Sequence, residues 1–275
     1  MRAVVVTGAS RGLGRATAEH LHAQGWTVVA AMRKPVDDPR FVTVELDVTD
    51  EASVAAAADA IRAAVGTPFG IIHNAGLSGV GTVEEMPQDV WEKIVSTNFL
   101  GPVRLTRALL PDMRAARRGR IVMVSSESGL LGMPGVGAYS ASKSALERWS
   151  EALSQEIAPF GLGITVLVTG TFKTDILELT TTYGDHAGPY GPLHSGLETK
   201  GRRFTRIAAD PAKFAPAVAQ ALDETKPFTR HAVGIDAKLL SLGARVLPTP
   251  VLQRIIRAAI GVPKPRRGGV SPGRA

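Results

Sequence analysis

The feature that most constrains the fold is the regular alternation of short apolar runs with longer segments of helical periodicity. Runs such as Ala3–Thr7 and 120–125 are rich in Val and Ile, and a helical pattern follows each of them. This alternation is typical of a parallel sheet with right-handed crossovers and helices on both faces. The strands of such a sheet are buried on both sides, so they are expected to be apolar throughout, as 4–6 and 121–124 are. The chain is therefore predicted to be an α/β protein with a doubly wound parallel sheet of about seven strands.

The expected elements follow from periodicity and from the turn residues between them. We expect strands at 3–7, 27–31, 42–46, 70–74, 120–125, 163–168 and 232–235, and helices near 12–24, 50–65, 88–116, 137–158 and 211–224. Five Gly and two Pro in 180–201 make a regular element unfavourable, so 176–206 is predicted to be a lid or substrate loop. An amphipathic helix is predicted at 251–260.

Length and composition suit one large domain. The chain has 275 residues, of which 44% are hydrophobic, enough for a full core. We expect a catalytic domain over 1–236, a C-terminal helical extension over 237–262, and a disordered basic tail over 263–275. With no Cys, the chain lacks disulfides, thiolate metal ligands and a cysteine nucleophile, and we expect no metal site.

The positive charge of the chain is concentrated near its C-terminal end. The formal charge is +7, but 237–275 hold eight basic residues and no acid, so 1–236 carry a net charge of −1. A nucleic-acid-binding domain would show a basic stripe across its fold, so we expect no nucleic-acid partner. The basic amphipathic helix leaves two alternatives: weak contact with an anionic membrane surface, or closure of the core with a solvated face outward.

Targeting signals are not found in the sequence. The first ten residues lack the apolar core of a signal peptide, and Arg, Pro or Gly interrupts each apolar stretch before the roughly 18 residues of a membrane span. We therefore expect a cytoplasmic location.

A glycine-rich loop joins the first predicted strand to the first predicted helix. Its sequence, TGASRGLG at 7–14, has glycines that permit a tight turn and a close approach of the backbone to a pyrophosphate. The free N–H groups and the dipole of the helix N-terminus favour such an anion. The position between strand and helix makes a dinucleotide site of Rossmann-like type the favoured interpretation.

Several motifs resemble those of the short-chain dehydrogenase/reductase family, and they appear in the family's order. These motifs are TGASRGLG at 7–14, LDVT at 46–49, HNAG at 73–76, Asn98, VSSESG at 124–129 and YSASK at 139–143. Together they cover roughly 3–175. The Arg-Lys-Pro sequence after the second predicted strand, the long lid and the C-terminal extension resemble the NADP-preferring 17β-hydroxysteroid and retinol dehydrogenase branch.

The end of the second predicted strand indicates which nicotinamide cofactor binds. A carboxylate there would accept hydrogen bonds from the adenosine ribose, whereas arginine attracts a 2′-phosphate. The chain has Met32 at the family's acidic position, Arg33 after it and Arg11 inside the glycine loop, so we predict NADP(H). The resemblance implies cofactor contacts from Gly8, Ser10, Arg11, Gly12, Leu13, Gly14, Arg33, Asp47, Val48, Asn74, Ala75, Gly76, Tyr139, Lys143 and Thr174.

The predicted chemistry depends on a tyrosine and a lysine four residues apart. In a helix, Tyr139 and Lys143 share one face, and a nearby ammonium together with a positive nicotinamide is expected to lower the pKa of the phenol. Ser126 lies 13 residues before Tyr139, which is the family's spacing, although Ser125 and Ser128 are neighbouring alternatives. The resemblance implies that Ser126 binds the substrate oxygen, Tyr139 exchanges its proton, Lys143 contacts the nicotinamide ribose, and Asn98 supports a water relay.

The residues expected around the cleft are mainly apolar. No arginine clamp for a carboxylate is evident, so a small lipophilic ketone, aldehyde or alcohol is the predicted substrate. The apolar residues expected at the cleft are Leu77, Leu130, Leu131, Met133 and Val136. A β-ketoacyl carrier-protein reductase and a non-catalytic NADP(H)-binding sensor are the alternatives. The resemblance also implies a homodimer or homotetramer formed through 88–116 and 137–158.

Overall fold

The computed structural model describes residues 2–174 and 180–262, and its centre is one seven-stranded parallel sheet. The strand order is β3-β2-β1-β4-β6-β7-β9. Strands β2 and β3 are added on one side of β1, and the later strands are added on its other side, beginning with β4. The strands are β1 (Ala3–Thr7), β2 (Thr27–Met32), β3 (Val42–Glu45), β4 (Gly70–His73), β6 (Gly119–Ser126), β7 (Leu162–Thr169) and β9 (Phe228–Val233). This confirms the predicted doubly wound α/β fold.

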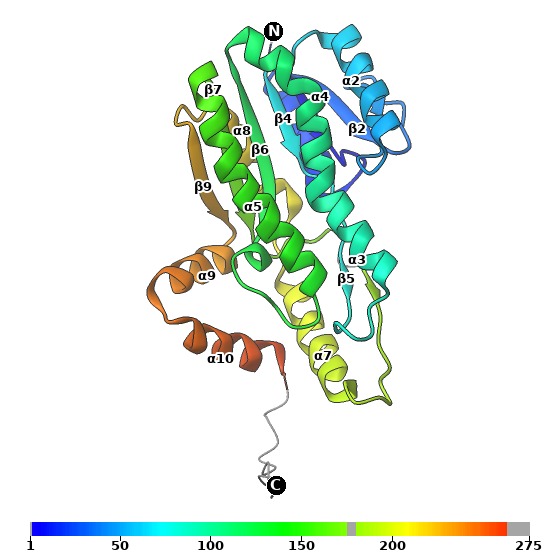
Figure 1. The fold of residues 1–275 in the computed structure, drawn as a ribbon, viewed down its shortest axis with the longest axis vertical. Coiled ribbons are helices and arrows are strands. Elements are labelled where there is room, and N and C mark those ends of the chain that lie inside the picture. The colour runs from blue at the N-terminus through cyan, green and yellow to red at the C-terminus, as the bar shows by residue number, and fades with distance from the viewer. Residues whose placement is uncertain (1, 175–179, 263–275) are drawn as a thin grey trace, which may run out of the picture.

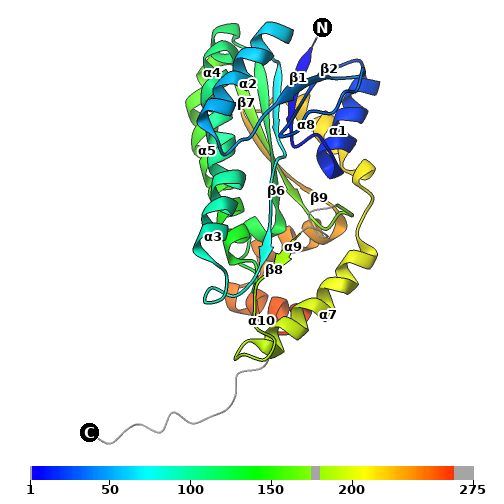
Figure 2. The same ribbon diagram turned by 90° about the vertical axis from the view of Figure 1, so that its right-hand side faces the viewer.

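Helices cover both faces of the sheet, as Figures 1 and 2 show. One face carries α2 (Glu51–Val65), α4 (Gly101–Ala116) and α5 (Gly137–Ile157), and the other carries α1 (Gly12–Ala23) and α8 (Ala215–Leu222). The predicted helix at 88–116 consists of α3 (Gln88–Val95), a π-helical turn (Ser96–Leu100) and α4.

The side chains of the strands divide into two hydrophobic cores. Val5, Ile71 and Ile121 belong to the core beneath α2, α4 and α5, whereas Val4 and Ile72 belong to the core on the α1 and α8 side. Successive residues of a strand point to opposite faces, which explains why runs such as 4–6 are apolar without alternation.

Two sequence-based predictions about the elements are wrong. Strand β9 begins at Phe228 and ends at Val233, and Ile235 instead begins the next helix, α9 (Ile235–Val246). Because β9 is an edge strand with half-buried residues, its sequence lacks the apolar run that marks the inner strands. The segment 180–201, expected to be irregular, contains β8 (Thr181–Thr182), paired with β5 (Gly79–Val80), and most of α7 (Gly191–Ile207).

The glycines of α7 have a packing role that explains the failed prediction. A Cβ atom added at Gly196 would lie 2.5 Å from the carbonyl oxygen of Gly261, so the two backbones pack too closely for any side chain. Gly261 follows α10 (Thr249–Ile260), the predicted amphipathic helix. Glycine here permits contact between two helices rather than ending one.

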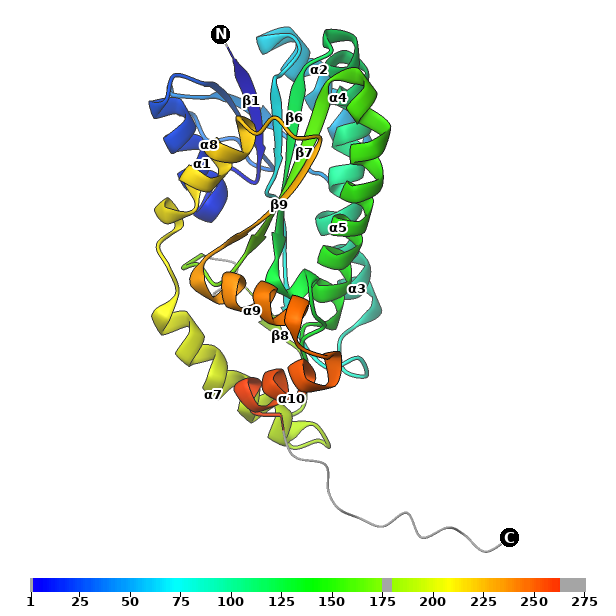
Figure 3. The same ribbon diagram turned by 90° about the vertical axis from the view of Figure 1, so that its left-hand side faces the viewer.

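Helices α7, α9 and α10 lie together beyond the ends at which the parallel strands finish (Figures 1 and 3). Of the predicted apolar arc of α10, Leu252 and Ile256 are buried, whereas Val251 and Ile255 are exposed. None of the helices in the described ranges has the length and apolar character needed to cross a bilayer. The predicted disordered tail, 263–275, lies outside the described residues.

Candidate active site

The glycine loop is folded tightly against the N-terminus of α1. Gly8 and Gly12 have φ angles of 67° and 55°, in the left-handed region that favours glycine. A Cβ atom at Gly14 would lie only 2.3 Å from the carbonyl oxygen of Gly8. The backbone therefore approaches itself closely and leaves the first N–H groups of α1 at the end of the sheet where a pyrophosphate would bind. This arrangement fits a dinucleotide cofactor.

Hydrogen bonds fix the loop to the neighbouring strand β4. The Nδ2 of Asn74 donates to the carbonyl oxygens of Thr7 (2.9 Å) and Gly8 (3.3 Å). The hydroxyl oxygen of Thr7 accepts the N–H groups of Asn74 and Ala75, both at 3.0 Å. Asn74 therefore links β1 and β4 at the point where the sheet changes direction. Gly76 continues this segment, and a Cβ added there would lie 3.3 Å from the Oδ1 of Asn98.

His73, at the end of β4, is a packed residue. It is 2% exposed, and its Nε2 lies 2.8 Å from the hydroxyl oxygen of Thr106. Burial lowers the pKa of His73 to about 3, because the imidazolium would lose its hydration. His73 is therefore neutral at ordinary pH.

The residues expected at the adenosine ribose lie at the ends of β2 and β3. Met32 is buried, whereas Arg33 is exposed. The carboxylate of Asp47 accepts hydrogen bonds from the N–H (2.9 Å) and hydroxyl (2.7 Å) of Thr49. Although burial opposes it, these hydrogen bonds and the charges of Arg33 and Lys93 lower the pKa of Asp47. Val48 is buried beside it.

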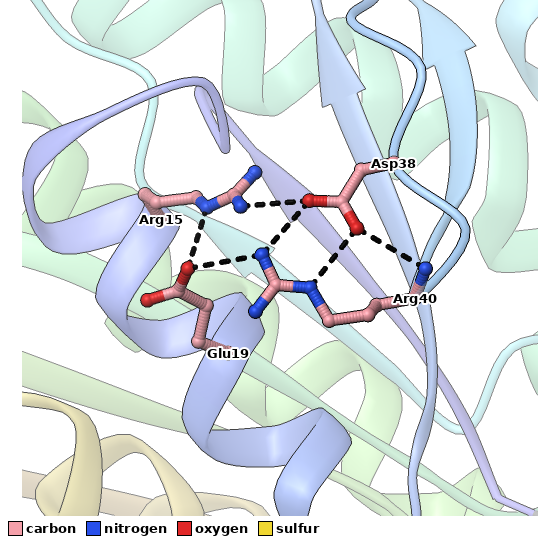
Figure 4. Close-up of polar contacts among 4 residues, drawn as sticks. All are labelled: Arg15, Glu19, Asp38 and Arg40. Atoms are coloured by element: carbon pink, nitrogen blue, oxygen red, sulfur yellow. Dashed lines mark hydrogen bonds and ion pairs between the residues drawn. The ribbon is translucent and has the colours of Figure 1, made fainter.

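A network of two arginines and two carboxylates holds the β2–β3 connection against α1 (Figure 4). Asp38 lies 2.7 Å from the Nη2 of Arg15 and 2.9 Å from the Nη2 of Arg40. Glu19 pairs with the same two arginines, at 2.9 and 3.3 Å. Hydrogen bonds from Arg40 keep the pKa of Asp38 well below its usual range. Arg15 and Arg40 are each paired with two carboxylates. Arg33 is therefore a better candidate than either of them to bind a 2′-phosphate on the adenosine ribose.

The segment after β7 lies close to the glycine loop. A Cβ atom added at Gly12 would lie 3.4 Å from the Cγ2 of Thr174, so these two residues border the same space. Asp236 of α9 holds the segment by accepting the N–H of Thr171 at 2.6 Å. The predicted cofactor residue Thr174 is thus brought to the N-terminus of α1, although it is 162 residues away in sequence.

Ser126, Tyr139 and Lys143 come together at the end of β6. Ser126 ends the strand, and interaction with its hydroxyl lowers the pKa of Tyr139 of α5 against the larger effect of burial. The Nζ of Lys143 lies 5.7 Å from the centroid of the Tyr139 ring and donates to the carbonyl oxygen of Val124 at 2.8 Å. One helix face therefore presents the phenol and the ammonium to the same space beside the strand end.

The neighbouring serines make other contacts. The hydroxyl of Ser125 donates to Glu147 at 2.7 Å, and that of Ser128 contacts the sulfur of Met133 at 3.6 Å. Of the three candidates, Ser126 is the one whose hydroxyl acts on the pKa of Tyr139. The spacing argument and the contacts thus favour the same serine.

Asn98 is fully buried in the π-helical turn between α3 and α4. Its Nδ2 donates to the carbonyl oxygen of Leu77 (2.9 Å) and to the hydroxyl of Ser142 (3.0 Å), and its Oδ1 accepts the N–H of Leu77 (2.9 Å). Asn98 therefore connects the segment after β4 to Ser142 of α5, the residue that precedes Lys143. π-Helical turns often occur at functional sites, and the sequence gives no signal for this one.

The pKa values at the site differ from the sequence-based expectation. In this chain the pKa of Tyr139 is raised, because burial and the nearby Glu127 outweigh the hydrogen bond from Ser126. The lowering expected beside a positive nicotinamide is therefore absent from the protein alone, where the pKa is raised. Burial lowers the pKa of Lys143 to about 8, although Glu147 opposes this shift. Burial and the charge of Asp236 raise the pKa of Glu127 to about 7.

Glu147 is a residue of the site that the sequence motifs do not include. Its side chain is 1% exposed, accepts the hydroxyl of Ser125, and lies 3.0 Å from the Nη2 of Arg230 on β9. It is four residues after Lys143 and eight after Tyr139, so helical spacing alone places it on the same face. Its partner Arg230 could not be found in this way, since it comes from the edge strand.

The fold and the glycine loop define a class: a dinucleotide-binding protein with a Rossmann-like sheet. The family described as short chain dehydrogenase matches residues 2–183. The chain is 34% identical to 3-ketodihydrosphingosine reductase from Bacteroides thetaiotaomicron, over 92% of this chain and 96% of that protein. It is 31% identical to mouse (Mus musculus) retinol dehydrogenase 5, over 92% and 87%.

A solved structure agrees with these relatives. The crystal structure of a short-chain dehydrogenase from Streptomyces avermitilis is 34% identical, covers 95% of this chain and 98% of its own, and superposes with a TM-score of 0.80. The chain therefore belongs to the short-chain dehydrogenase/reductase family, whose members bind NAD(P) and act as oxidoreductases.

Proposed function

We propose that this protein is an NADP(H)-dependent oxidoreductase that interconverts a lipophilic ketone or aldehyde and the corresponding alcohol. The observation that carries the proposal is the convergence of Ser126, Tyr139 and Lys143 at the end of β6. A hydroxyl, a phenol and an ammonium in this arrangement can bind one oxygen atom and exchange its proton.

The glycine loop, Asp47, Asn74, Ala75, Gly76 and Thr174 are the residues proposed to hold the cofactor. The nicotinamide, when bound, would supply or accept the hydride. Tyr139 donates its proton to the substrate oxygen in reduction and accepts it in oxidation, while Ser126 hydrogen-bonds the same oxygen. Lys143 stabilises the phenolate and binds the nicotinamide ribose.

The raised pKa of Tyr139 is consistent with this role. A phenol that is protonated in the protein alone is a competent acid, and positive charge beside it would then favour the phenolate. Asn98 is proposed as a positioning residue, because its hydrogen bonds hold the segment after β4 against α5.

Support for NADP(H) over NAD(H) comes from the residues at the end of β2 and from Arg11 inside the glycine loop. Met32 stands where a ribose-binding carboxylate would be expected, and exposed Arg33 follows it. Replacement Arg33→Asp is expected to raise the KM for NADPH by about tenfold or more and to change the KM for NADH much less. Lys34→Asp, one residue further on, is the matched control for the added charge.

Support for an apolar substrate comes from the residues near Ser126 and from the relatives. Leu77, Leu130, Met133 and Val136, which are among the apolar residues expected at the cleft, are all half-buried. Retinol and 3-ketodihydrosphingosine, which the names of two relatives mention, each combine a long apolar chain with an oxidisable or reducible group. The proposed substrate shares this chemistry.

A panel of apolar ketones, aldehydes and alcohols, assayed with NADPH, NADP, NADH and NAD, tests the proposal. We expect turnover of an apolar carbonyl with NADPH, and a loss of about 10² to 10⁴ in kcat/KM for Tyr139→Phe with a much smaller change in NADPH affinity. Turnover of acetoacetyl thioesters alone would instead indicate a carrier-protein reductase. NADPH binding without turnover of any member would contradict the catalytic role.

The assembly and location are proposed from the family. We propose that copies pair through 88–116, which contains α3 and α4, and through α5, and that the enzyme works in the cytoplasm. Helices α4 and α5 cover one face of the sheet (Figure 2). Light scattering of the purified protein would give the mass of the assembly, and a monomer at micromolar concentration would reject the pairing.

A further inference from the structure

Exposed apolar side chains are concentrated on two helices at one end of the molecule. Of the ten large hydrophobic side chains that are exposed in the described ranges, seven lie between Ile235 and Ile255, in α9, in α10 and in the short connection between them. The other three, Val36, Val83 and Leu100, are scattered singly. Single exposed hydrophobic residues are normal, but a concentration of this kind marks an interaction surface.

On α9 these side chains form one stripe. Ile235, Leu239, Leu242 and Val246 follow the spacing of one helix face, and they are 60% to 74% exposed. Ala237, on another side of the helix, is fully buried. The helix therefore packs on the protein through Ala237 and half-buried residues such as Leu240, and it presents four other large apolar side chains outward.

The same pattern continues on α10. Leu252 and Ile256 are buried, and Leu252 packs beside Gly243 of α9, whereas Val251 and Ile255 are exposed. Both helices thus bury one side against the protein and leave a second apolar side unused. Packing against the core explains why one side of each helix is buried, but it does not explain the exposed apolar side.

Basic residues accompany the apolar stripes. Lys238 and Arg245 of α9 and Arg254 and Arg257 of α10 are exposed. Asp236 is the only acid in 235–262, and its carboxylate accepts the N–H groups of Thr171 and Ala237. The sequence of 263–275, which continues directly from this end, adds four basic residues and no acid.

From these observations we propose that α9 and α10 form a docking surface for an anionic lipid bilayer, lying in its interface without crossing it. Apolar stripes flanked by Lys and Arg match the boundary between acyl chains and anionic headgroups. A second copy of the chain fits less well, because a two-fold pair would bring the same cations face to face. We define the docking surface as the exposed side chains of 235–257.

Vesicle sedimentation tests the proposal with the full chain and without substrate. The protein is expected to sediment with vesicles of phosphatidylcholine and phosphatidylglycerol, and much less with phosphatidylcholine alone or at high salt. The double variant Leu239→Ser/Leu242→Ser should lower the partition coefficient by about tenfold or more. Lys238→Gln/Arg245→Gln should lower it by about fivefold per charge removed.

Matched controls separate the docking surface from general hydrophobicity and charge. Val36→Ser/Val83→Ser removes two exposed apolar side chains elsewhere, and Arg107→Gln/Arg118→Gln removes two exposed charges of α4 and the turn after it. Both are expected to bind vesicles as the unchanged protein does. Equal losses in the controls, or recovery of the unchanged protein in the supernatant, would overturn the proposal.

Misfolding and self-association are each tested by one further measurement. Because all four residues substituted on α9 are exposed, their variants are expected to unfold at the same temperature as the unchanged protein. If light scattering shows an oligomer that Leu239→Ser/Leu242→Ser dissociates in the absence of lipid, the occupant is a second copy and the bilayer proposal fails. Turnover of a water-soluble carbonyl is measured separately, so failure of docking and failure of the proposed function remain distinguishable.

Discussion

The buried imidazole of His73 gives the fold a pH dependence of its own. Its pKa is about 3 in the folded chain and about 6.5 when unfolded, so the unfolded chain binds one more proton between these values. Stability is therefore expected to fall as the pH falls from 6.5 towards 3, by up to about 1.4 kcal/mol per pH unit from this residue.

His73→Asn should remove this contribution while leaving a polar group near Thr106. Urea unfolding at about pH 7 and about pH 5 measures it, since the variant should lose less stability between the two conditions. An equal loss in both proteins would show that His73 is not the source.

Glu147 is expected to act on the reaction through Lys143. Its carboxylate raises the pKa of Lys143 against the effect of burial, so Glu147→Gln should lower that pKa further from about 8. If the ammonium is required, the basic limb of the pH profile of kcat/KM should move to lower pH. Glu151→Gln is the matched control. Glu151 pairs with Arg230 as Glu147 does, but it is Glu147 that accepts the hydroxyl of Ser125 and raises the pKa of Lys143. An equal shift in both variants would contradict this role.

How much of the site the sequence could predict depends on whether its residues are related by local spacing. Ser126, Tyr139 and Lys143 are found from a strand end and a helix repeat, and their convergence follows from the parallel sheet. Arg230 and Asp236 reach the site from β9 and α9, and no spacing in the sequence relates them to α5. The raised pKa of Tyr139 could not be predicted either, because it depends on burial and on Glu127.

Helix α7 is tied to the segment before α3 by one carboxylate. Glu85 accepts hydrogen bonds from the hydroxyl of Thr82 (2.6 Å) and the N–H of Asp185 (3.0 Å), and lies 2.8 Å from the Nε2 of buried His194. These contacts hold α7 and the chain before it against β5. The predicted lid is therefore a tethered helix.

Removal of this tether should affect substrate binding more than the chemical step. Glu85→Ala is expected to raise the KM for the carbonyl by about fivefold or more with a smaller change in kcat, since a net hydrogen bond is worth about 1 kcal/mol. Steady-state kinetics measure both values. Asp89→Ala on α3 is the control, and an equal change there, or a fall in kcat alone, would contradict the tether.

At the level of elements, the inner strands are predicted well from sequence and the later elements poorly. β1, β4 and β6 are buried on both faces, so their apolar runs define them. β9 is half-buried, and α7 and α9 each depend on contacts with α10. The glycines of α7 favour a loop in any sequence-based prediction, because close helix packing and a turn require the same residue.

Across the whole molecule, the excess positive charge lies outside the part of the chain that forms the two hydrophobic cores. The nearly neutral body contains both cores, whereas the basic residues of 237–275 lie in or beyond the last two helices. Removal of 263–275 would change the formal charge from +7 to +3. Within the part of the chain that the structure describes, neither core includes a residue of 237–262.

We therefore expect a chain of residues 1–262 to unfold at the same temperature as the full chain and to keep its turnover of a water-soluble carbonyl. Thermal unfolding followed by circular dichroism and an NADPH oxidation assay would measure these properties. A clearly lower midpoint would show that the tail packs on the body.

The contact between Gly196 and Gly261 has a mechanical consequence. Because the two backbones touch, α7 cannot swing away from the strand ends as an independent flap; it must carry the end of α10 or break the contact. Product escape on the α7 side would then need either a joint displacement of the two helices or loss of this contact. Such a step would limit turnover where hydride transfer is fast.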